Sequence, residues 1–359
     1  MTAPAAPASL YPLLAFCVSA LVVVLTTPLV RSLGLQQGLV DQPGERKVHH
    51  RPMVRLGGIS IFLGSLAALL LTWWLGGFGV LPPDREYEIW GVTIGGLVFF
   101  LIGLADDFFS LSPITRLLAQ LAVASGVWLV GVRIDLLTIP FVGGVYVLPE
   151  WLSLPVTVIW LVGMTNAINW IDGLDGLAAG VSGISAVILL IVALAVQQPA
   201  AALVAAALAG GCLGFLRYNF NPAKIFMGDG GSYFIGFTLA GVGVIGLVKS
   251  LATVAVLLPF LILAVPLLDM VTVIFDRLRS GQSPFKADKR HLHHRLLDAG
   301  FSHRRTVVLI YGLTLCAGSW ALAFASIPSG YAYAIASTLL VIVLFALSRR
   351  RSRRSLPRT

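Results

Sequence analysis

Long apolar runs alternate with short polar segments along most of this chain. A helix needs about 20 apolar residues to cross the hydrocarbon layer of a bilayer. Because the runs are continuous and not alternating, they favour membrane-spanning helices over a β-barrel. We therefore predict an all-α polytopic membrane protein with about eleven transmembrane helices. The predicted spans are residues 10–30, 57–77, 89–105, 117–132, 153–168, 178–197, 201–218, 234–248, 253–274, 305–325 and 331–347.

Basic residues gather on one side of the predicted membrane. The loops, span ends and tail of that side hold 22 of the 25 Lys and Arg residues, and the other side holds only Arg85, Arg133 and Lys249. Since basic loops stay in the cytoplasm, we predict a periplasmic N-terminus and a cytoplasmic C-terminus. The net charge of +9 follows from this asymmetry and requires no nucleic-acid partner.

The composition agrees with the predicted membrane protein. The chain is 57% hydrophobic and 11% charged, which excludes a soluble domain of this length. We predict one transmembrane catalytic domain over residues 1–348 and a basic cytoplasmic tail over 349–359. The first span has no basic segment before it and no clear cleavage site after it, so we expect it to be retained. The three isolated cysteines predict neither a disulfide framework nor a thiolate metal site.

Two adjacent acids, Asp106 and Asp107, follow the apolar run LVFFLIGLA. Neighbouring carboxylates at a membrane face repel each other unless a cation or a basic group lies close by. The pair therefore indicates either a solvated helix end or a metal-linked or general-base pair. Arg116 lies ten residues further on, after the turn signal Ser112-Pro113, and can fold back towards a phosphate.

The segment NAINWIDGLDGLA contains Asn169, Asp172 and Asp175 together with Gly173 and Gly176. The glycines disfavour a regular helix throughout and allow a ligand to approach the backbone. The oxygens of Asn and Asp suit a hard cation or the edge of a base. A polar seam between helices is the alternative interpretation.

Two further polar segments suit phosphate groups. FMGDGGS places Asp229 in a glycine-rich turn before the next span, which indicates a phosphate or metal site or a simple turn. RHLHHRLLDAG places His291, His293 and His294 among basic residues, which favours an anion site for a diphosphate. A surface basic patch and a zinc site are the alternatives, and no Cys or HExxH pattern supports zinc. Together the clusters predict Mg²⁺-assisted phosphoryl transfer at the cytoplasmic face.

Two observations concern the ninth predicted span. Pro259 and Pro266 lie inside it, and we expect them to bend the helix and open a lateral groove for a lipid chain. Asp269 is the only carboxylate well inside a span, and we predict that it packs between helices or faces the groove. Transporters place ionisable groups near the middle of the bilayer, so this distribution of acids argues against a transporter.

The ordered set of segments resembles the polyprenyl-phosphate N-acetylhexosamine-1-phosphate transferase family, which is glycosyltransferase family 4. DQPGERKVHHRPMVRLGG resembles the first cytoplasmic loop of that family, and ADDFFSLSP, NAINWIDGLDGLAAG, FMGDGGS and HLHH match in place. The resemblance covers about residues 10–305. It implies that a UDP-N-acetylhexosamine gives its sugar 1-phosphate to a polyprenyl phosphate and that UMP is released.

The resemblance also implies catalytic and metal-binding roles. Asp106 is the candidate base for the lipid phosphate, and Asp107 lies close to the metal. Asn169 and Asp229 hold Mg²⁺, for which Mn²⁺ is an alternative. Direct attack by the lipid phosphate and an aspartyl–phosphosugar intermediate are both open, and we favour direct attack because two phosphates brought together need no added covalent step.

Further residues are implied to bind the substrate. Asp172 shapes the nucleotide site and Asp175 reaches the uracil. Arg116 stands where many members have Lys, which changes the geometry but not the charge. The residues implied to contact the diphosphate are Arg116, His291, His293 and His294.

HLHH followed by RLLDAGFS resembles the bacterial N-acetylglucosamine branch more than the muramoyl-pentapeptide branch. We therefore expect UDP-N-acetylglucosamine and undecaprenyl phosphate as substrates, membrane lipid as the surroundings and the bacterial cytoplasmic membrane as the location. The product would initiate synthesis of a cell-surface glycan. A phospho-N-acetylmuramoyl-pentapeptide transferase and a nucleotide-sugar or phosphate transporter are the alternatives, and a homodimer stays open.

Overall fold

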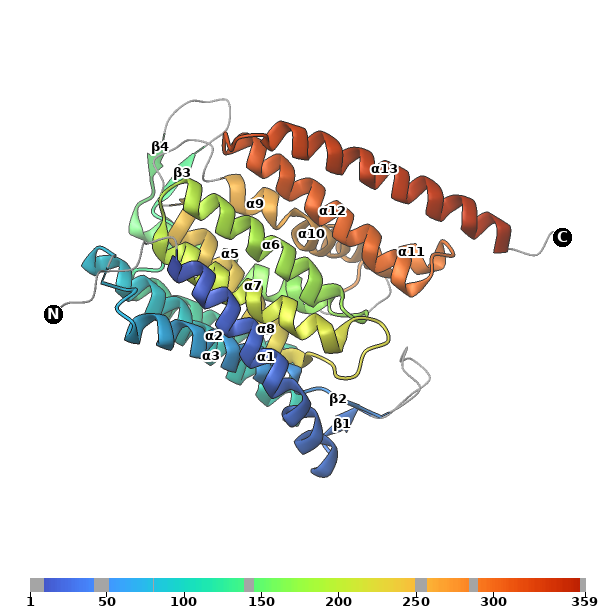
Figure 1. The fold of residues 1–359 in the computed structure, drawn as a ribbon, viewed down its shortest axis with the longest axis horizontal. Coiled ribbons are helices and arrows are strands. Elements are labelled where there is room, and N and C mark those ends of the chain that lie inside the picture. The colour runs from blue at the N-terminus through green and yellow to red at the C-terminus, as the bar shows by residue number, and fades with distance from the viewer. Residues whose placement is uncertain are drawn as a thin grey trace.

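The computed structural model of this protein describes residues 10–41, 52–79, 81–138, 145–248, 257–283 and 290–355. These residues form a mainly helical bundle (Figure 1). Eight of the helices are long and apolar enough to cross a membrane, which agrees with the predicted class of protein. They are α1 (Leu10–Gln36), α2 (Gly57–Trp74), α3 (Pro83–Phe109), α5 (Glu150–Ile171), α6 (Leu177–Ala195), α7 (Pro199–Asn219), α12 (His303–Phe324) and α13 (Gly330–Ser355).

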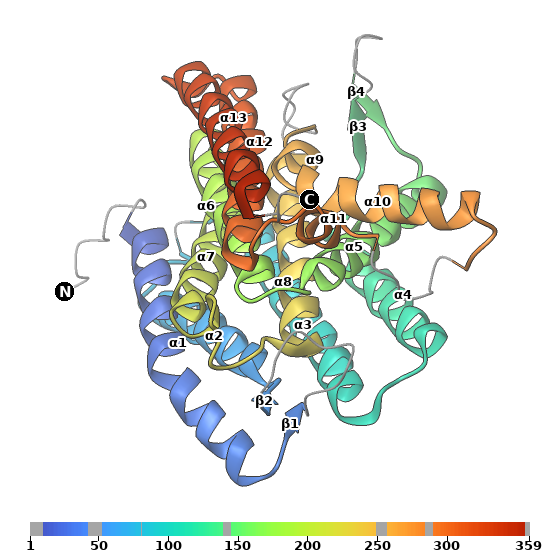
Figure 2. The same ribbon diagram turned by 90° about the vertical axis from the view of Figure 1, so that its right-hand side faces the viewer.

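The other three predicted spans fall on shorter or interrupted helices. These are α4 (Pro113–Leu129), α8 (Gly228–Val242) with its π-helical continuation η1 (Gly243–Val248), and the pair α9 (Leu258–Ile262) and α10 (Ala264–Arg279). The predicted bend is confirmed, because the helix stops at Ile262 and resumes at Ala264. Figure 2 shows α10 running across the direction of its neighbours. The count of eleven crossings and the orientation stay predictions.

Two short antiparallel strand pairs depart from the all-helical prediction. β1 (Val40–Asp41) pairs with β2 (Met53–Val54), and β3 (Leu136–Thr138) pairs with β4 (Val145–Val147). The two pairs lie at opposite ends of the bundle (Figure 2). Strands of two or three residues are too short to leave a period-two pattern in the sequence, which is why the apolar runs did not reveal them.

Several helices extend beyond their predicted ends, and α3 and α13 are the cases that matter for the site and the tail. α3 continues through Phe109, so that Asp106 and Asp107 lie in its last turn and not in the loop that follows residue 105. The backbone of α13 continues to Ser355, so the first part of the predicted tail is helical. Hydropathy marks the part of a helix that lies in lipid, but the hydrogen-bonded backbone can continue into the polar region beyond it.

The core that positions the site is centred on α8, which packs against α2, α3 and α5 and is buried at every residue except Asp229. Its first turn makes backbone contacts that only glycine allows. A Cβ on Gly58 would lie 2.3 Å from the Cα of Gly231, and one on Gly103 would lie 2.3 Å from the carbonyl oxygen of Asp229. The start of α8 is therefore held directly against the backbones of α2 and α3.

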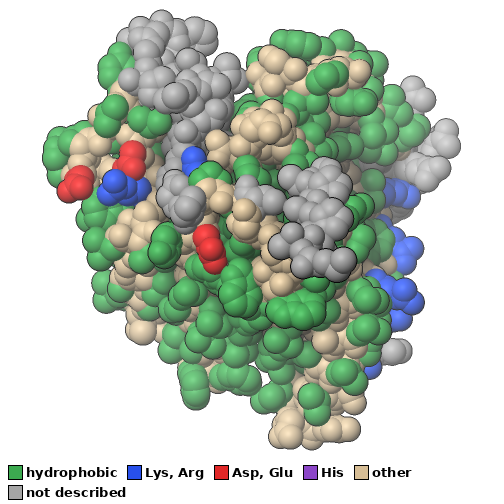
Figure 3. All heavy atoms as spheres, turned by 60° about the vertical axis from the view of Figure 1, so that its left-hand side comes forward, with side chains coloured by type: hydrophobic (Ala, Val, Ile, Leu, Met, Phe, Trp, Pro, Cys, Tyr) green, Lys and Arg blue, Asp and Glu red, His purple; other side chains and the backbone are tan. Residues whose placement is uncertain are grey.

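The outer surface fits a membrane environment. The face drawn in Figure 3 is largely hydrophobic, and Lys and Arg side chains gather along one edge of it. On the opposite end of the bundle, Arg133 pairs with Asp135 and lies 3.9 Å from Glu150. A wide apolar surface between two polar ends is what a polytopic membrane protein presents to lipid and water.

Candidate active site

The last turn of α3 and the first turn of α8 meet through Asp107. Its two carboxylate oxygens accept hydrogen bonds from the backbone N–H groups of Asp229 and Gly230, each at 3.0 Å. The first N–H groups of a helix have no partner inside the helix and carry partial positive charge. Asp107 therefore caps α8 and fixes the backbone of Asp229. The prediction that Asp107 lies close to a metal stays a prediction.

The structure brings Asn169 and Asp229 together, although they lie on different helices. The side-chain amide of Asn169 donates to Oδ1 of Asp229 at 2.8 Å and to Oγ of Ser232 at 3.0 Å. Asn169 faces Asp229 with its amide nitrogen and carries the amide oxygen on the same group, so a turn of the amide would place two oxygens together. Mg²⁺ is usually held by one or two such protein oxygens together with substrate phosphates and water. The residues present therefore fit the predicted cation.

A site made mainly by protein ligands is not seen. Within the described ranges, no three His, Cys, Asp or Glu side chains converge as a metal-binding group. The three histidines of the HLHH segment are included in that statement, so nothing in this part of the chain supports the zinc alternative.

Asp106 lies beside this pair but is held by other groups. Arg116 donates to its Oδ2 at 2.5 Å, and the backbone N–H of Leu111 donates to its Oδ1 at 2.8 Å. Asp106 is also close enough to Asp229 for their carboxyl groups to interact. Arg116 thus folds back as expected, but its partner here is Asp106. The proposed base role of Asp106 and the diphosphate contact of Arg116 stay predictions.

The predicted break in the NAINWIDGLDGLA segment is confirmed. α5 ends at Ile171 and α6 begins at Leu177, and Gly176 takes a φ of 78°, which favours glycine. In the turn between the helices, Oδ2 of Asp175 accepts hydrogen bonds from Asn221 Nδ2 at 2.9 Å and from the backbone N–H of Ala223 at 3.0 Å. Asp175 therefore ties the turn to the loop before α8.

Asp172 stands at the C-terminal end of α5, where it is partly buried. Burial, and next the negative charge of Asp229, raise the pKa of Asp172 to about 7. A carboxyl group that is half protonated near neutral pH can donate as well as accept a hydrogen bond. This property suits a group that faces a nucleotide.

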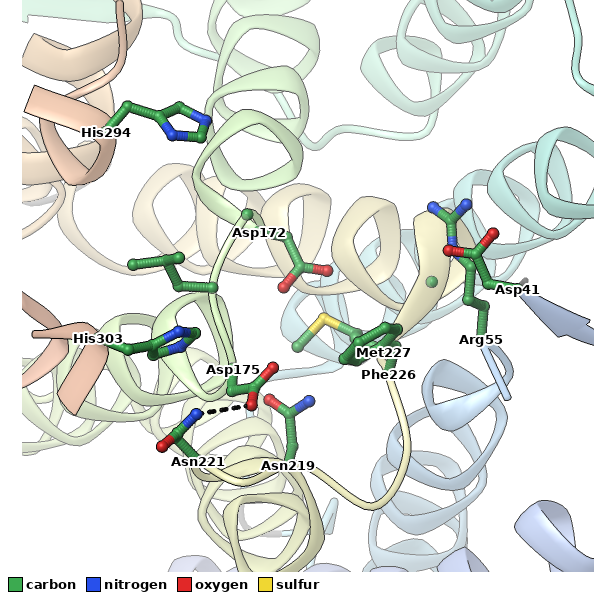
Figure 4. A pocket seen from close by; sticks show the side chains of 13 residues that line it. Asp41, Arg55, Asp172, Asp175, Asn219, Asn221, Phe226, Met227, His294 and His303 are labelled. Carbon is green, nitrogen blue, oxygen red and sulfur yellow. Dashed lines mark hydrogen bonds between the residues drawn. The ribbon is translucent and has the colours of Figure 1, made fainter. Parts of the chain in front are cut away.

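A cavity of about 370 Å³ opens beside these acids (Figure 4). Of the predicted site residues, Asp172, Asp175 and His294 line it. It is also lined by Asp41, Arg55, Gly173, Leu174, Asn219, Asn221, Phe226, Met227, Gly228 and His303. Its polar wall and its position at the end of membrane helices suit a charged, water-soluble ligand.

Five polar residues of this wall had no assigned site role in the sequence-based prediction: Asp41, Arg55, Asn219, Asn221 and His303. Arg55 was noted only as one basic residue of the first loop. The two asparagines lie just before the FMGDGGS segment and were assigned no role. His303 belongs to no motif, and only the packing of α12 against α6 brings it near Asp175.

The three predicted histidines have different surroundings. His291 pairs through Nδ1 with Oδ2 of Asp269 at 2.8 Å, and the backbone N–H of Leu292 donates to Oδ1 of the same acid at 2.7 Å. His293 is buried against Gly173, where an added Cβ would lie 2.5 Å from its Nε2. His294 lines the cavity. Contact with a diphosphate stays a prediction for all three.

Burial sets the charge of the central histidine. Desolvation, and then the neighbouring His294 and His291, lower the pKa of His293 to about 3. His293 is therefore neutral at physiological pH and serves as packing for the turn at Gly173. Asp269, predicted as a packing or groove residue, is buried and organises the start of α11 (Leu292–Asp298) through His291.

Some predicted residues cannot be placed. Five basic residues of the first loop lie outside the described part of the chain, and so does Lys289. The five are Arg46, Lys47, His49, His50 and Arg51. Arg55, from the same loop, is described.

The geometry defines a class of protein: a helical membrane protein with an acid–amide pair and a polar cavity at one end of the bundle. The sequence model of a family described as glycosyl transferase family 4 matches residues 89–247. A Bacillus subtilis (strain 168) protein, named a probable undecaprenyl-phosphate N-acetylglucosaminyl 1-phosphate transferase, is 40% identical over 83% of this chain and 80% of its own length. The chain belongs to glycosyl transferase family 4, as its motifs predicted.

Two other relatives show the breadth of the similarity. The decaprenyl-phosphate N-acetylglucosaminephosphotransferase of Mycobacterium leprae is 38% identical over 82% of this chain and 78% of its own length. The undecaprenyl-phosphate alpha-N-acetylglucosaminyl 1-phosphate transferase of Salmonella typhi is 31% identical over 89% of this chain and 84% of its own length. The similarity therefore extends well beyond the segment matched by the family description.

Proposed function

We propose that this protein transfers N-acetylglucosamine 1-phosphate from UDP-N-acetylglucosamine to undecaprenyl phosphate in the bacterial cytoplasmic membrane. UMP is the second product, and the lipid-linked diphosphate sugar initiates synthesis of a cell-surface glycan. The observation that carries the proposal is the Asn169–Asp229 pair beside a polar cavity at the end of a membrane-helix bundle. There a soluble nucleotide sugar and a membrane-held phosphate can meet.

The reaction requires positioning and neutralisation of charge more than covalent help from the protein. An oxygen of the lipid phosphate attacks the phosphorus attached to the sugar, and the bond from that phosphorus to the UMP oxygen breaks. The bond between the sugar and its phosphate is kept. Asp106 accepts the proton of the lipid phosphate once Arg116 turns from it towards the substrate. Asp172 and Asp175 shape the wall that receives the nucleotide.

Asn169 and Asp229 are the proposed protein ligands of Mg²⁺, and Mn²⁺ is expected to replace it. The bound cation would neutralise the diphosphate of the donor. Asp107 acts through the backbone of α8, because its oxygens bind the N–H groups of Asp229 and Gly230. The proposed arrangement thus divides the three acids: one accepts a proton, one holds the cation and one holds the helix.

The acceptor lipid is proposed to approach along α10. This helix presents the exposed apolar side chains of Leu268, Val271 and Phe275, and the break at Leu263 turns it across the bundle. On the same helix, buried Asp269 links to the HLHH segment. A polyprenyl chain that lies along the apolar face would bring its phosphate towards the polar end of the cavity.

UMP release from the purified protein tests this function. Full-length protein in detergent would receive Mg²⁺, undecaprenyl phosphate and one of three donors: UDP-N-acetylglucosamine, UDP-N-acetylgalactosamine or UDP-muramoyl-pentapeptide. We expect UMP with the first donor, and we expect Asp229→Asn to abolish it while the protein stays folded. UMP with the pentapeptide donor alone would favour the muramoyl alternative. Movement of intact UDP-sugar across proteoliposomes without UMP release would favour a transporter.

A further inference from the structure

Arg55 is held at the acid cluster by its backbone. It lies between β2 and α2, and the loop before α8 brackets it with hydrogen bonds from Phe226 N to Val54 O at 2.8 Å and from Gly57 N to Phe226 O at 2.9 Å. A Cβ on Gly228 would lie 2.1 Å from the carbonyl oxygen of Arg55. The backbone of Arg55 is therefore packed against the residue that precedes Asp229.

The guanidinium of Arg55 shares two of the acids. Its Nη2 lies 3.9 Å from Oδ1 of Asp107 and 3.9 Å from Oδ1 of Asp229. These distances allow an ion pair but are too long for hydrogen bonds. Four carboxylates act on it electrostatically, from the strongest to the weakest: Asp229, Asp107, Asp41 and Asp172. Arg55 is thus a counter-charge to the cluster without a close contact to either Asp107 or Asp229.

The side chain also has freedom to leave this position. It is 44% exposed, whereas that of Asp107 is 4% exposed, and it projects at the rim of the cavity with Asp41 (Figure 4). The oxygens of Asp107 are already occupied by the backbone of α8. Among the described residues, the Arg55 side chain makes no hydrogen bond that its withdrawal would break, and of the two acids it faces at 3.9 Å, Asp229 is the one not held by the backbone of α8.

Arg55 and a divalent cation need the same negative charge. A cation held by Asn169 and Asp229 would need the negative charge of the Asp229 carboxylate, which Arg55 also faces. Two positive groups that face the same carboxylate repel each other. A diphosphate removes the conflict, because its oxygens can bind the metal and also accept charge-assisted hydrogen bonds from a guanidinium.

We propose that Arg55 is the resident counter-cation of the acid cluster and gives way to the metal when a nucleotide diphosphate binds. This inference rests on the proposed function and adds that the metal and the nucleotide bind cooperatively. The metal binds weakly without nucleotide, and each ligand strengthens the binding of the other. Arg55 then moves from Asp229 to the diphosphate and holds the donor. It is a substrate-positioning residue as well as a charge that keeps the empty site stable.

The test measures binding of Mn²⁺ as the probe, without turnover. Free Mn²⁺ is followed by electron paramagnetic resonance in titrations of the full-length protein in detergent, with and without UDP-N-acetylglucosamine and with no acceptor lipid. In Arg55→Met, which keeps an unbranched side chain but loses the charge, we expect Mn²⁺ alone to bind on the order of tenfold more tightly. The factor by which the nucleotide increases Mn²⁺ affinity should be smaller in this variant. By thermodynamic linkage, the factor by which Mn²⁺ increases nucleotide affinity must be smaller to the same extent.

Two variants serve as controls. Arg55→Lys keeps the charge and should retain most of the coupling between metal and nucleotide. Arg31→Met removes a charge from the end of α1, where Arg31 donates to the carbonyl oxygen of Lys224 at 2.9 Å, and should change neither affinity. Thermal unfolding of each variant shows whether the protein is folded in the titrations.

The outcomes separate this inference from the proposed function. If folded Arg55→Met binds Mn²⁺ alone no more tightly than the wild type, the counter-cation role is overturned. The same holds if the nucleotide's effect on Mn²⁺ affinity is unchanged in that variant. In either case UMP release by the wild type would leave the proposed function standing. A wild-type protein that neither binds UDP-N-acetylglucosamine nor releases UMP would instead overturn the proposed function.

Discussion

Single residues in this site act through different partners even where their chemistry is alike. Asp107 and Asp106 are neighbours on α3, yet the first binds backbone N–H groups of α8 and the second pairs with Arg116. A substitution that removes a carboxylate should therefore have different effects at the two positions. The effect of each on folding and on activity distinguishes a helix cap from a group that meets substrate.

Asp107→Ala should lower both stability and UMP release. The change leaves two N–H groups at the start of α8 without their charged acceptor, at a cost on the order of 2 kcal/mol, and it loosens Asp229. Asp229→Asn should instead abolish UMP release with little change in unfolding temperature. Thermal unfolding and UMP release measured on the same preparations check both. An Asp107→Ala protein of wild-type stability that lacks activity would contradict the capping role.

Asp172 should make stability depend on pH. Its pKa is about 7 in the folded protein and about 3.9 in an unfolded chain, so between these values the folded state binds more protons. Stability is therefore greatest at the acidic end of this window and falls as the pH rises through 7. At about 1.4 kcal/mol per pKa unit, the total reaches at most about 4 kcal/mol.

Comparison with Asp172→Asn isolates this contribution. The variant should gain stability relative to the wild type at pH 8 and not at pH 5. Unfolding temperatures of both proteins in a chelator, measured at the two pH values, provide the test. An equal difference between the proteins at both pH values would show that the carboxyl group does not titrate in this window.

Elements of the site are joined by side chains that reach from one helix to the next. Asp269 on α10 binds the ring of His291 and the backbone N–H of Leu292, and thereby fixes the start of α11. Asp175 joins the turn between α5 and α6 to the loop before α8. The α10–α11 link connects the helix proposed to meet the lipid with the segment predicted to contact the diphosphate.

Asp269→Asn should weaken catalysis without unfolding the protein. An amide cannot accept both hydrogen bonds with the same geometry, so the HLHH segment should shift, and such misplacement can cost about 10- to 100-fold in kcat/KM. Thr272→Val is the matched control, since Thr272 lies on α10 and bonds only to carbonyls of its own helix. Steady-state UMP release with varied UDP-N-acetylglucosamine measures the effect. Equal kcat/KM values for Asp269→Asn and Thr272→Val would show that Asp269 does not contribute to the site.

At the scale of the whole molecule, the two ends of the bundle should face different compartments. Phe109, the last residue of α3, and Val147 on β4 are each 76% exposed. Figure 2 shows β4 at the end of the bundle opposite the loop that joins α3 to α4. In a variant without Cys17, Cys212 and Cys316, a single cysteine at position 147 should react with an impermeant maleimide added to intact cells. One at position 109 should react only after the membrane is opened. The reverse pattern would contradict the predicted orientation.

Much of the fold could be predicted because it is written in local patterns. The predicted spans fall on helices, the ninth on the pair α9 and α10, and the glycines at 173 and 176 marked the break between α5 and α6. The contacts inside the site could not be read in this way. That Asp107 caps α8, or that His303 reaches the cavity, depends on how distant helices pack. Resemblance to the family paired Asn169 with Asp229, which no spacing along the chain could have done.

The bracket around Arg55 also has a consequence for how the protein is made. Its hydrogen bonds join Val54 and Gly57 to Phe226. The ribosome must therefore add about 170 residues after Gly57 before Phe226 is available to form them. Because the chain is synthesised from its N-terminus, His294 and His303 are added later still. A nascent chain that stops before α12 can therefore insert many of its helices into the membrane while its cavity lacks a wall. The ability to bind the sugar donor should arise only after α12 has been synthesised.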